Sequence, residues 1–312
     1  MLVEEELARI SPAEDTFVTV GVFDGVHLGH KHLISQLVGK AEQESSLSVV
    51  VTFRQHPQEV LRPDIILPFL TNLAEREKLL ENEGVDIIVP LTFTAEASRL
   101  SAREFIGLLR KYLCMSGMVI GPDFALGSKR QGNADALRAL GREMGFSVTV
   151  VPPVVIDGEI VSSTAIRQAL SAGDMHRVRR FAGRNFSFQS RIVAGAGRGV
   201  EMGFPTANLD IGPEHALPAD GVYATWAGIG SETLPSMTNI GTNPTFGDNR
   251  RAVEVYIVDY RGDLYGQELR LEFVERLRGE MRFDSVEELK KQVAEDVKRG
   301  VAILSVKGGK QT

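Results

Sequence analysis

The sequence is poor in cysteine and contains no long hydrophobic run. Cys114 is the single cysteine among 312 residues, so an internal disulfide is impossible and a reducing compartment is expected. No apolar run approaches the ~20 residues that span a bilayer. The acidic start MLVEEELARI also lacks the apolar core of a secretory signal. We therefore expect a cytoplasmic protein without a membrane-spanning segment.

Net positive charge is also absent, which bears on the class of partner. The chain has 35 Lys and Arg residues against 41 Asp and Glu residues, a net charge of -6, and its pI is about 5.6. Proteins that follow a phosphate backbone are usually basic, so we expect small-molecule substrates and no nucleic acid. Cys114 lies in the apolar run YLCMSGMVIG and is expected to be a buried small hydrophobic residue.

The first half of the chain alternates between strand-like and helix-like runs. Strands are expected at 17–23, 47–53, 85–93, 117–121 and 146–155, and helices at 30–44, 71–84, 101–113 and 133–145. This alternation predicts a doubly wound α/β domain with a parallel sheet and helices on both faces. Ligands of such domains bind past the carboxyl ends of the strands.

The pattern changes after about residue 183. Short β-rich runs separated by Gly, Pro, Asn and Asp occur at 187–197, 221–229, 234–241, 251–260 and 267–277. They predict a small antiparallel barrel or sandwich. Near the end, Ser285 and Glu288 form a capping box for a terminal helix, whose apolar face holds Val286, Leu289, Val293 and Val297. The boundary is expected near residues 181–188, giving domains 1–182 and 183–312.

A first candidate site lies in VGVFDGVHLGHKHLI, residues 20–34, where the first strand meets the first helix. His27 and His30 lie three apart in a loop with Gly21, Gly25 and Gly29. Glycines let a ligand approach the backbone, and amides at a helix start favour an anion, so the loop suits a pyrophosphate. A polar helix cap with two solvated histidines explains the spacing equally well. Two histidines without cysteines or an HExxH pattern are a poor zinc site.

A second stretch, IVSSTAIRQALSAGD, favours the anion interpretation. It places Ser162, Ser163 and Thr164 at a helix start, with Arg167 one turn inside. Hydroxyls and a guanidinium fork at a helix N-terminus suit a polyphosphate. Simple capping by Ser163 would leave Arg167 unexplained. Two such segments in one α/β domain therefore indicate a nucleoside triphosphate site.

The second half offers a different candidate in GFPTAN. Thr206 and Asn208 alternate on an extended segment and therefore share a face. Their oxygens suit Mg²⁺, which keeps most of its waters and the phosphates of a substrate. An ordinary turn explains PTAN equally well on composition alone. The P-loop pattern GxxxxGK[ST] does not occur in the sequence, so a P-loop is excluded.

These segments resemble known motifs. GVFDGVHLGH resembles the His-x-Gly-His signature of nucleotidylyltransferases, and SSTAIR resembles their second phosphate motif. Class I aminoacyl-tRNA synthetases share that superfamily, but their lysine-rich second signature has no counterpart here. Over nearly the whole chain the sequence is similar to the prokaryotic bifunctional riboflavin kinase/FMN adenylyltransferase family. The similar segments are VTFRQHPQEVL, LTNLAEREKLLENEGVD, GPDFALGSKRQGN, GFPTAN, GVYAT, NIGTNPTFG, VEVYIVDYRGDLYG and LRGEMRFDSVEEL.

For the first half the resemblance implies adenylyl transfer from ATP to FMN, giving FAD and pyrophosphate. It implies that His27 and His30 bind the triphosphate and stabilise the transition state. Ser163, Thr164 and Arg167 would hold the phosphates from the other side. The remaining implied nucleotide or flavin-phosphate contacts are Gly21, Phe23, Asp24, Gly25, Gly29, His56 and Asp123.

For the second half the resemblance implies a β-barrel that phosphorylates riboflavin to FMN with ATP and Mg²⁺. Thr206 and Asn208 would position the metal and ATP, with Gly203 beside them. Glu254 would be the base for the ribityl hydroxyl. Arg278 and Phe283 would close over the flavin ring.

Two departures from the family pattern leave alternatives open. Tyr256 stands where the family usually has histidine, and Arg54-Gln55 stands where it usually has Asp-Pro. A weakened or lost kinase, leaving a monofunctional FMN adenylyltransferase, is the alternative that Tyr256 suggests. A flavin-binding module without catalysis is disfavoured because His27, His30 and Glu254 are all present.

Overall fold

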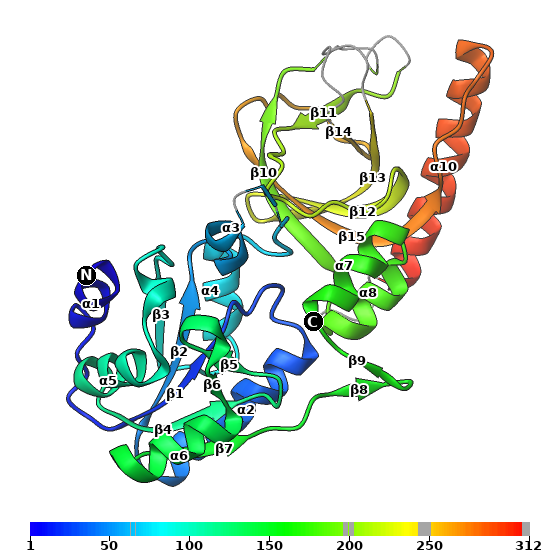
Figure 1. Cartoon of the computed structure of the whole chain (residues 1–312). Coiled ribbons are helices and arrows are strands. Elements are labelled where there is room, and N and C mark those ends of the chain that lie inside the picture. The colour runs from blue at the N-terminus through cyan, green and yellow to red at the C-terminus, as the bar shows by residue number, and fades with distance from the viewer. Residues whose placement is uncertain (63, 66, 196–198, 200–202, 243–250, 308–312) are drawn as a thin grey trace. The chain divides into compact units, whose positions relative to one another are not determined.

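The structure is a computed structural model that describes residues 1–312 except 63, 66, 196–198, 200–202, 243–250 and 308–312. It contains two compact units, Met1–Ser163 and Thr164–Thr312 (Figure 1). The division comes earlier than the boundary predicted near residues 181–188. The difference consists of α7 (Ser163–Ala172) and α8 (Met175–Ala182), which fall almost entirely in the second unit. α8 packs on β-strands of that unit. Of the segment NIGTNPTFG, residues 243–247 lie outside the described residues.

The first unit is built on a five-stranded parallel sheet with the order β3-β2-β1-β4-β7. Its strands are β1 (Thr16–Val20), β2 (Leu47–Phe53), β3 (Ile87–Leu91), β4 (Met115–Ile120) and β7 (Ser147–Val150). The helices are α1 (Leu2–Ala8), α2 (Leu28–Gln43), α3 (Pro57–Leu61), α4 (Leu73–Glu81), α5 (Ala102–Leu113) and α6 (Ala134–Met144). The predicted doubly wound α/β fold is confirmed.

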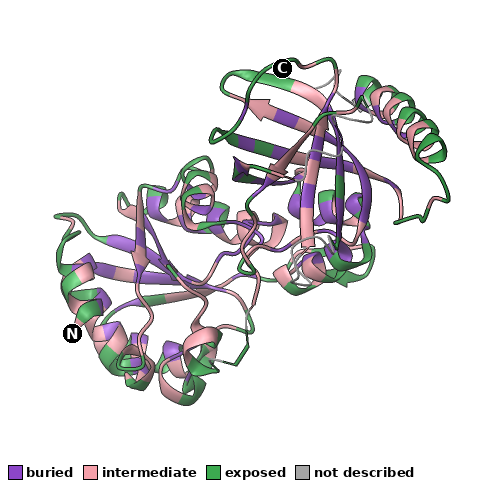
Figure 2. Ribbon diagram, turned by 90° about the horizontal axis from the view of Figure 1, so that it is seen from above, coloured by how far each residue is buried: buried purple, intermediate pink, exposed green. Residues whose placement is uncertain are grey.

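Helices cover both faces of this sheet because successive strand residues point to opposite sides. Val18 and Met118 pack on one side in a core that includes Leu109 of α5. On the other side Phe17 packs in a separate core with Ile34 of α2. Figure 2 shows the buried residues concentrated along the strands and the inward faces of the helices.

Three local predictions were wrong. β1 ends at Val20, so residues 21–23 belong to the loop. The strand predicted at 146–155 stops at Val150, because the Pro-Pro pair at 152–153 interrupts it, and Val155 begins the separate hairpin β8 (Val155–Ile156) and β9 (Glu159–Ile160). Cys114 is only half-buried; it ends α5 with φ 50° and its Sγ donates to the Pro12 carbonyl at 3.3 Å. A second hairpin, β5 (Ala125–Leu126) with β6 (Gly132–Asn133), was not predicted.

The second unit contains a closed antiparallel barrel with the order β10-β11-β14-β13-β12-β15. Its strands are β10 (Phe186–Val193), β11 (Thr206–Leu209), β12 (Gly221–Ile229), β13 (Glu232–Thr242), β14 (Arg251–Ile257) and β15 (Glu268–Arg278). The last helix, α10 (Val286–Lys307), packs Leu304 on Val222, Met237 and Leu277 outside the barrel. The predicted barrel with a terminal helix is confirmed.

The start of α10 generates a stability prediction. The Glu288 amide donates to Ser285 Oγ at 3.2 Å, and the Glu288 carboxylate accepts from the Asp284 amide at 3.2 Å. The cap predicted from the sequence therefore forms, with its return bond one residue earlier. Ser285→Ala removes an N-terminal acceptor, so we expect a loss of about 1 kcal/mol in the free energy of unfolding.

Trp226 in β12 is the only tryptophan, so its fluorescence follows unfolding of the barrel unit in urea. Ser305→Ala on the same helix is the matched control. Its exposed hydroxyl donates only to the Val301 carbonyl, and we expect a change within about 0.5 kcal/mol. Equal urea midpoints for the two variants would contradict the capping role.

Candidate active sites in the two units

The loop after β1 leaves the carboxyl end of the central strand. The chain runs from β1 outward to β2 and β3 and then returns to β4 on the other side of β1. The carboxyl end of β1 is therefore the switch point of the strand order, where doubly wound folds bind ligands. Phe23, Gly25 and Val26 have φ values of 52°, 80° and 33°. Glycine adopts such values freely, whereas a β-branched valine does so only under strain that its surroundings hold in place. The loop is therefore a turn fixed by its neighbours.

His27 and His30 lie together at the start of α2. His27 is 4% exposed, and its Nδ1 caps the helix by accepting from the His30 amide at 3.2 Å. The two rings stack with centroids 3.6 Å apart, and Phe23 meets His30 edge-on at 5.1 Å. Because Nδ1 accepts a backbone N–H, the neutral His27 ring carries its proton on Nε2, which makes that atom a donor. The helix cap is confirmed, but His27 is buried and not solvated, and the cap is compatible with phosphate binding.

Gly29 and Ser163 bring a distant segment against this loop. A Cβ on Gly29 would lie 3.1 Å from the His27 ring and 3.1 Å from the Val161 carbonyl. Ser163 Oγ donates to the Asp24 carbonyl at 2.8 Å. Thr164 and Arg167 follow on α7 in the second unit, and their position relative to the histidines stays a prediction.

Asp24 lies between the histidine loop and a neighbouring segment, and its predicted contact with the nucleotide stays a prediction. Its carboxylate is buried, with the residue 2% exposed, and accepts from the Leu70 amide at 2.9 Å and the Thr71 amide at 3.1 Å. Gly25 donates its amide to Thr71 Oγ1 at 3.0 Å. Asp24 thus positions the loop through the segment that precedes α4. Gly21, directly after β1, donates its amide to the Val51 carbonyl.

His56 and Asp123 lie on the loops that follow β2 and β4. His56 caps α3, its Nδ1 accepting from the Gln58 amide at 3.1 Å, and Asp123 is exposed. Since β2 and β4 flank β1 in a parallel sheet, these loops leave the same sheet edge as the histidine loop. The pair Arg54-Gln55, which differs from the family pattern, has contacts beside His56. Gln55 Nε2 donates to the Phe93 carbonyl at 2.7 Å, and Arg54 Nε lies 3.7 Å from Glu6 Oε1.

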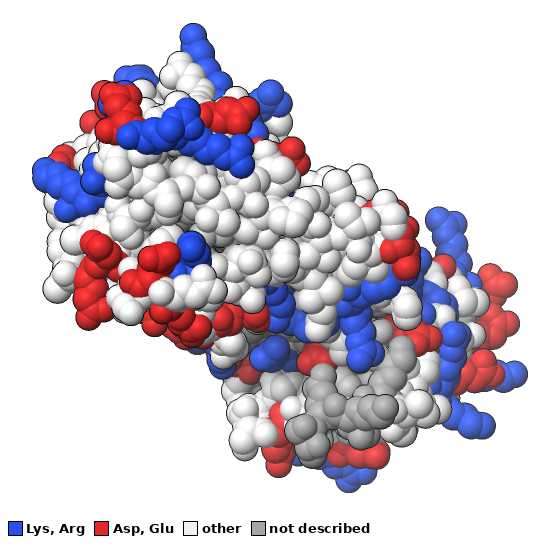
Figure 3. Space-filling view, turned by 90° about the horizontal axis from the view of Figure 1, so that it is seen from below, with Lys and Arg blue, Asp and Glu red and all other residues white. Residues whose placement is uncertain are grey.

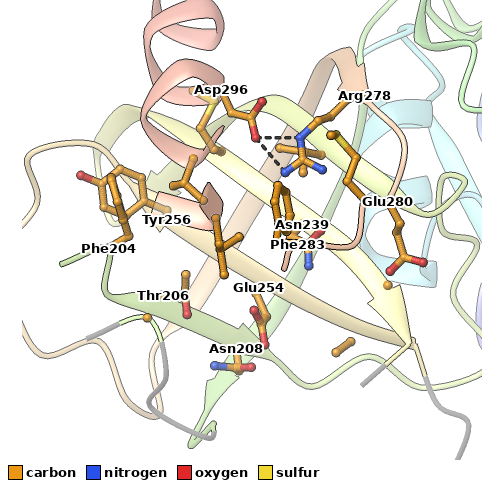
Figure 4. A pocket seen from close by; sticks show the side chains of 18 of the residues that line it. Phe204, Thr206, Asn208, Asn239, Glu254, Tyr256, Arg278, Glu280, Phe283 and Asp296 are labelled. Carbon is orange, nitrogen blue, oxygen red and sulfur yellow. Dashed lines mark hydrogen bonds and ion pairs between the residues drawn. The ribbon is translucent and has the colours of Figure 1, made fainter. Parts of the chain in front are cut away.

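The second unit has a pocket of about 400 Å³ on the outside of the barrel, next to α10 (Figure 4). Its floor is one cross-strand row, because β15, β12, β13, β14 and β11 are in register there. The row consists of Arg278, Val222, Asn239, Glu254 and Asn208. Along β14, Val253 and Val255 are buried while Glu254 and Tyr256 face the pocket. The predicted residues Thr206, Asn208, Glu254, Arg278 and Phe283 all line it.

The Thr206 and Asn208 side chains are enclosed by glycines that sequence reasoning missed. A Cβ on Gly195 would lie 2.0 Å from Asn208 Nδ2, and one on Gly199 would lie 3.1 Å from Thr206 Oγ1. The Glu254 side chain points toward Asn208 in Figure 4. Gly203, with φ 83°, forms the turn before β11. Three oxygen-bearing side chains, those of Thr206, Asn208 and Glu254, therefore line the same pocket, and the glycines allow the backbone to approach two of them closely.

Arg278 is held by a residue that was not predicted, Asp296 of α10. The Arg278 Nε and Nη2 atoms both lie 2.9 Å from Asp296 Oδ2, and the guanidinium lies 5.8 Å from the centre of the Phe283 ring. Asp296 is 6% exposed and accepts a further bond from Gln292 at 3.0 Å. Its signal in the sequence is an acidic residue between Val293 and Val297 on the apolar face of the helix. Asn239 and Glu280 also line the pocket and were missed.

Other site classes find no support in the part of the chain that the structure describes. Within it no group of three or more His, Cys, Asp or Glu side chains is arranged to hold a metal ion. Among the same residues no helix combines the length and apolarity that crossing a bilayer demands. On the face in Figure 3, acidic and basic side chains are interspersed around a broad uncharged area.

Comparisons with known proteins also divide the chain into two regions. A sequence model of FAD synthetase matches residues 9–165, and one of riboflavin kinase matches residues 182–304. The bifunctional riboflavin kinase/FMN adenylyltransferases of Escherichia coli K12 and Pseudomonas fluorescens are 35% and 36% identical, over 92% of both chains in each case. A crystal structure described as a macrolide-efflux protein from Streptococcus pneumoniae is 31% identical, with a TM-score of 0.87 over 96% of both chains. The chain belongs to the bifunctional riboflavin kinase/FMN adenylyltransferase family.

Proposed function

We propose that this chain makes FAD in two steps: it phosphorylates riboflavin to FMN with ATP, then adenylylates FMN with a second ATP and releases pyrophosphate. Family membership and the two matched regions support both activities. Residues 183–312 carry the kinase and residues 1–182 the adenylyltransferase. The observation that carries the proposal is the pocket row in which Glu254 lies between Asn208 and Asn239.

In the kinase step the ribityl 5′-hydroxyl attacks the γ-phosphorus of ATP, the bond to the β-phosphate oxygen breaks, and ADP leaves. Glu254 accepts the hydroxyl proton as general base, a role that its place on the pocket face of β14 supports. Arg278, fixed by Asp296, and Phe283 hold the flavin ring. A fixed guanidinium and an aromatic ring suit a flat heteroaromatic ligand.

The donor set fits Mg²⁺. Thr206 and Asn208 present oxygen ligands on one face of β11, and because Gly195 and Gly199 lack a Cβ, the backbone approaches both side chains closely. Mg²⁺ takes few protein oxygens and completes its shell with water and substrate phosphates. We propose that Thr206 and Asn208 hold the metal together with ATP. When bound, Mg²⁺ would neutralise charge on the phosphates.

Loss of the kinase activity is not favoured by the position of Tyr256. Its ring packs edge-on against Phe204 with centroids 5.3 Å apart, and it pairs with Thr206 across the strands. It therefore forms a wall of the pocket one row away from Glu254. Nor do we propose efflux, because both matched regions and the curated relatives name flavin enzymes.

In the second step a phosphate oxygen of FMN attacks the α-phosphorus of ATP in line, and the bond to the departing pyrophosphate breaks. His27 donates from Nε2 to the phosphates, and His30 and the α2 amides add to the stabilisation of developing charge. Ser163, Thr164 and Arg167 hold the phosphates from α7. His56 and Asp123, on loops of the same sheet edge, contact either the flavin phosphate or the nucleotide.

Replacing Glu254 tests the kinase assignment. Glu254→Gln keeps size and removes the base, so kcat for riboflavin phosphorylation should fall at least about 100-fold, while FAD synthesis from supplied FMN persists. Flavin chromatography separates riboflavin, FMN and FAD and measures both. Glu268→Gln, an exposed residue at the start of β15, is the matched control and should leave both rates unchanged. Unchanged riboflavin phosphorylation in Glu254→Gln removes Glu254 from this role.

Replacing the histidines should have the reverse effect. His27→Ala with His30→Ala removes donors to the triphosphate, so FAD synthesis should fall at least about 100-fold while FMN still forms from riboflavin. Since His27 also caps α2, His27→Asn with His30→Ala keeps a capping acceptor and should lose FAD synthesis as severely. His32→Ala on the same helix is the control. Full FAD synthesis in either double variant would refute the phosphate-binding role.

A further inference from the structure

Arg76 is the largest side chain that the first unit buries completely. It is 1% exposed and lies on the core-facing side of α4, four residues before the buried Leu80. Burial lowers the pKa of the Arg76 guanidinium below its usual value, and the charge of Asp24 opposes that shift. A buried cation is costly to hold, and an apolar side chain of similar length would fill such a site at lower cost. Core packing alone therefore does not account for arginine at this position.

The polar contacts of Arg76 lead to the histidine loop. Its Nη1 donates to the Val22 carbonyl at 2.6 Å and lies 3.5 Å from Thr52 Oγ1. Thr52 Oγ1 donates to the same Val22 carbonyl at 3.0 Å. The guanidinium also stacks over the Phe69 ring, 5.0 Å from its centre. Two donors thus converge on the carbonyl directly before Phe23, the first residue of the loop with positive φ.

The other contacts of the loop come from the same segment as Arg76. Leu70 and Thr71 donate their amides to Asp24, and Thr71 Oγ1 accepts from the Gly25 amide. Residues 69–76 therefore hold the loop at positions 22, 24 and 25, just before Val26 and the His27 cap. Arg76 contributes a fixed charge to this set, with its Nε atom lacking a hydrogen-bond partner among the described residues. It is too deeply buried to reach a ligand itself.

We propose that Arg76 is a positioning residue for adenylyl transfer. By binding the Val22 carbonyl it keeps the turn at residues 23–26 in its strained conformation, and so aims His27 and His30 at the triphosphate. This inference rests on the proposed FAD synthesis in the first unit. Because the histidines act on the transition state, loosening the turn lowers kcat more than it raises KM.

The test compares Arg76→Met with wild-type enzyme in both reactions. Methionine fills much of the same volume without charge or donors, so we expect the first unit to fold. We expect kcat for FAD synthesis from FMN and ATP to fall about 10–100-fold, with KM for either substrate changed less than about threefold. Riboflavin phosphorylation by the second unit is the internal control and should be unchanged. Arg76→Lys keeps the charge and a single donor nitrogen, so its kcat should lie between those of the wild-type enzyme and Arg76→Met.

A second variant separates positioning from lost stability. Leu109→Ala opens a cavity in the core on the opposite face of the same sheet, so it should lower the melting temperature without lowering kcat. An equal loss of kcat in Leu109→Ala, or wild-type kcat in Arg76→Met, overturns the proposal. If Arg76→Met does not fold, Arg76→Lys decides, since wild-type kcat there would overturn it. Wild-type enzyme that makes no FAD would refute the proposed function instead.

Discussion

A buried carboxylate holds the reactive part of each site in place. In the first unit the Asp24 carboxylate accepts backbone amides from Leu70 and Thr71, and in the second unit Asp296 binds Arg278. Both acidic residues are buried and accept hydrogen bonds from protein groups. Such bonds are strong where water is excluded, because an unpaired buried charge is costly. They can hold a turn or a guanidinium in a conformation that packing alone would not select.

The kinase site depends on strand register as much as on residue identity. Glu254 faces the pocket because Val253 and Val255 on either side of it are drawn into the buried side of the strand. A slip of one residue would bury the carboxylate and expose two valines. Hydrophobic alternation along β14 therefore fixes the register that brings Asn208, Glu254 and Asn239 into one row. The same alternation forms the core and aligns the site.

Local patterns predicted most of the sheet and barrel strands and the long helices, whereas short elements such as the β5–β6 hairpin and the long-range contacts were not predicted from the sequence. Apolar periodicity and the Gly and Asn residues at segment ends located the sheet strands and long helices, and the extended PTAN segment correctly placed Thr206 and Asn208 on one face. Arg76 lies on the same helix face as Leu80, so its burial could have been inferred. Its partner, the Val22 carbonyl, is 54 residues away and needed the fold. Asp296 likewise binds Arg278 through tertiary packing of α10.

The two departures from the family pattern occupy positions where the backbone and its neighbours set the geometry. Tyr256 forms a wall beside Phe204, while the carboxylate that the chemistry needs stands one row away on β14. Gln55 binds the Phe93 carbonyl, so the loop carrying His56 keeps an anchor from the side chain that replaces the usual proline. A substitution is tolerated at such positions when the new side chain still supports its neighbours. The side chains that would meet phosphate, hydroxyl or metal have no such freedom, because their chemistry itself is required.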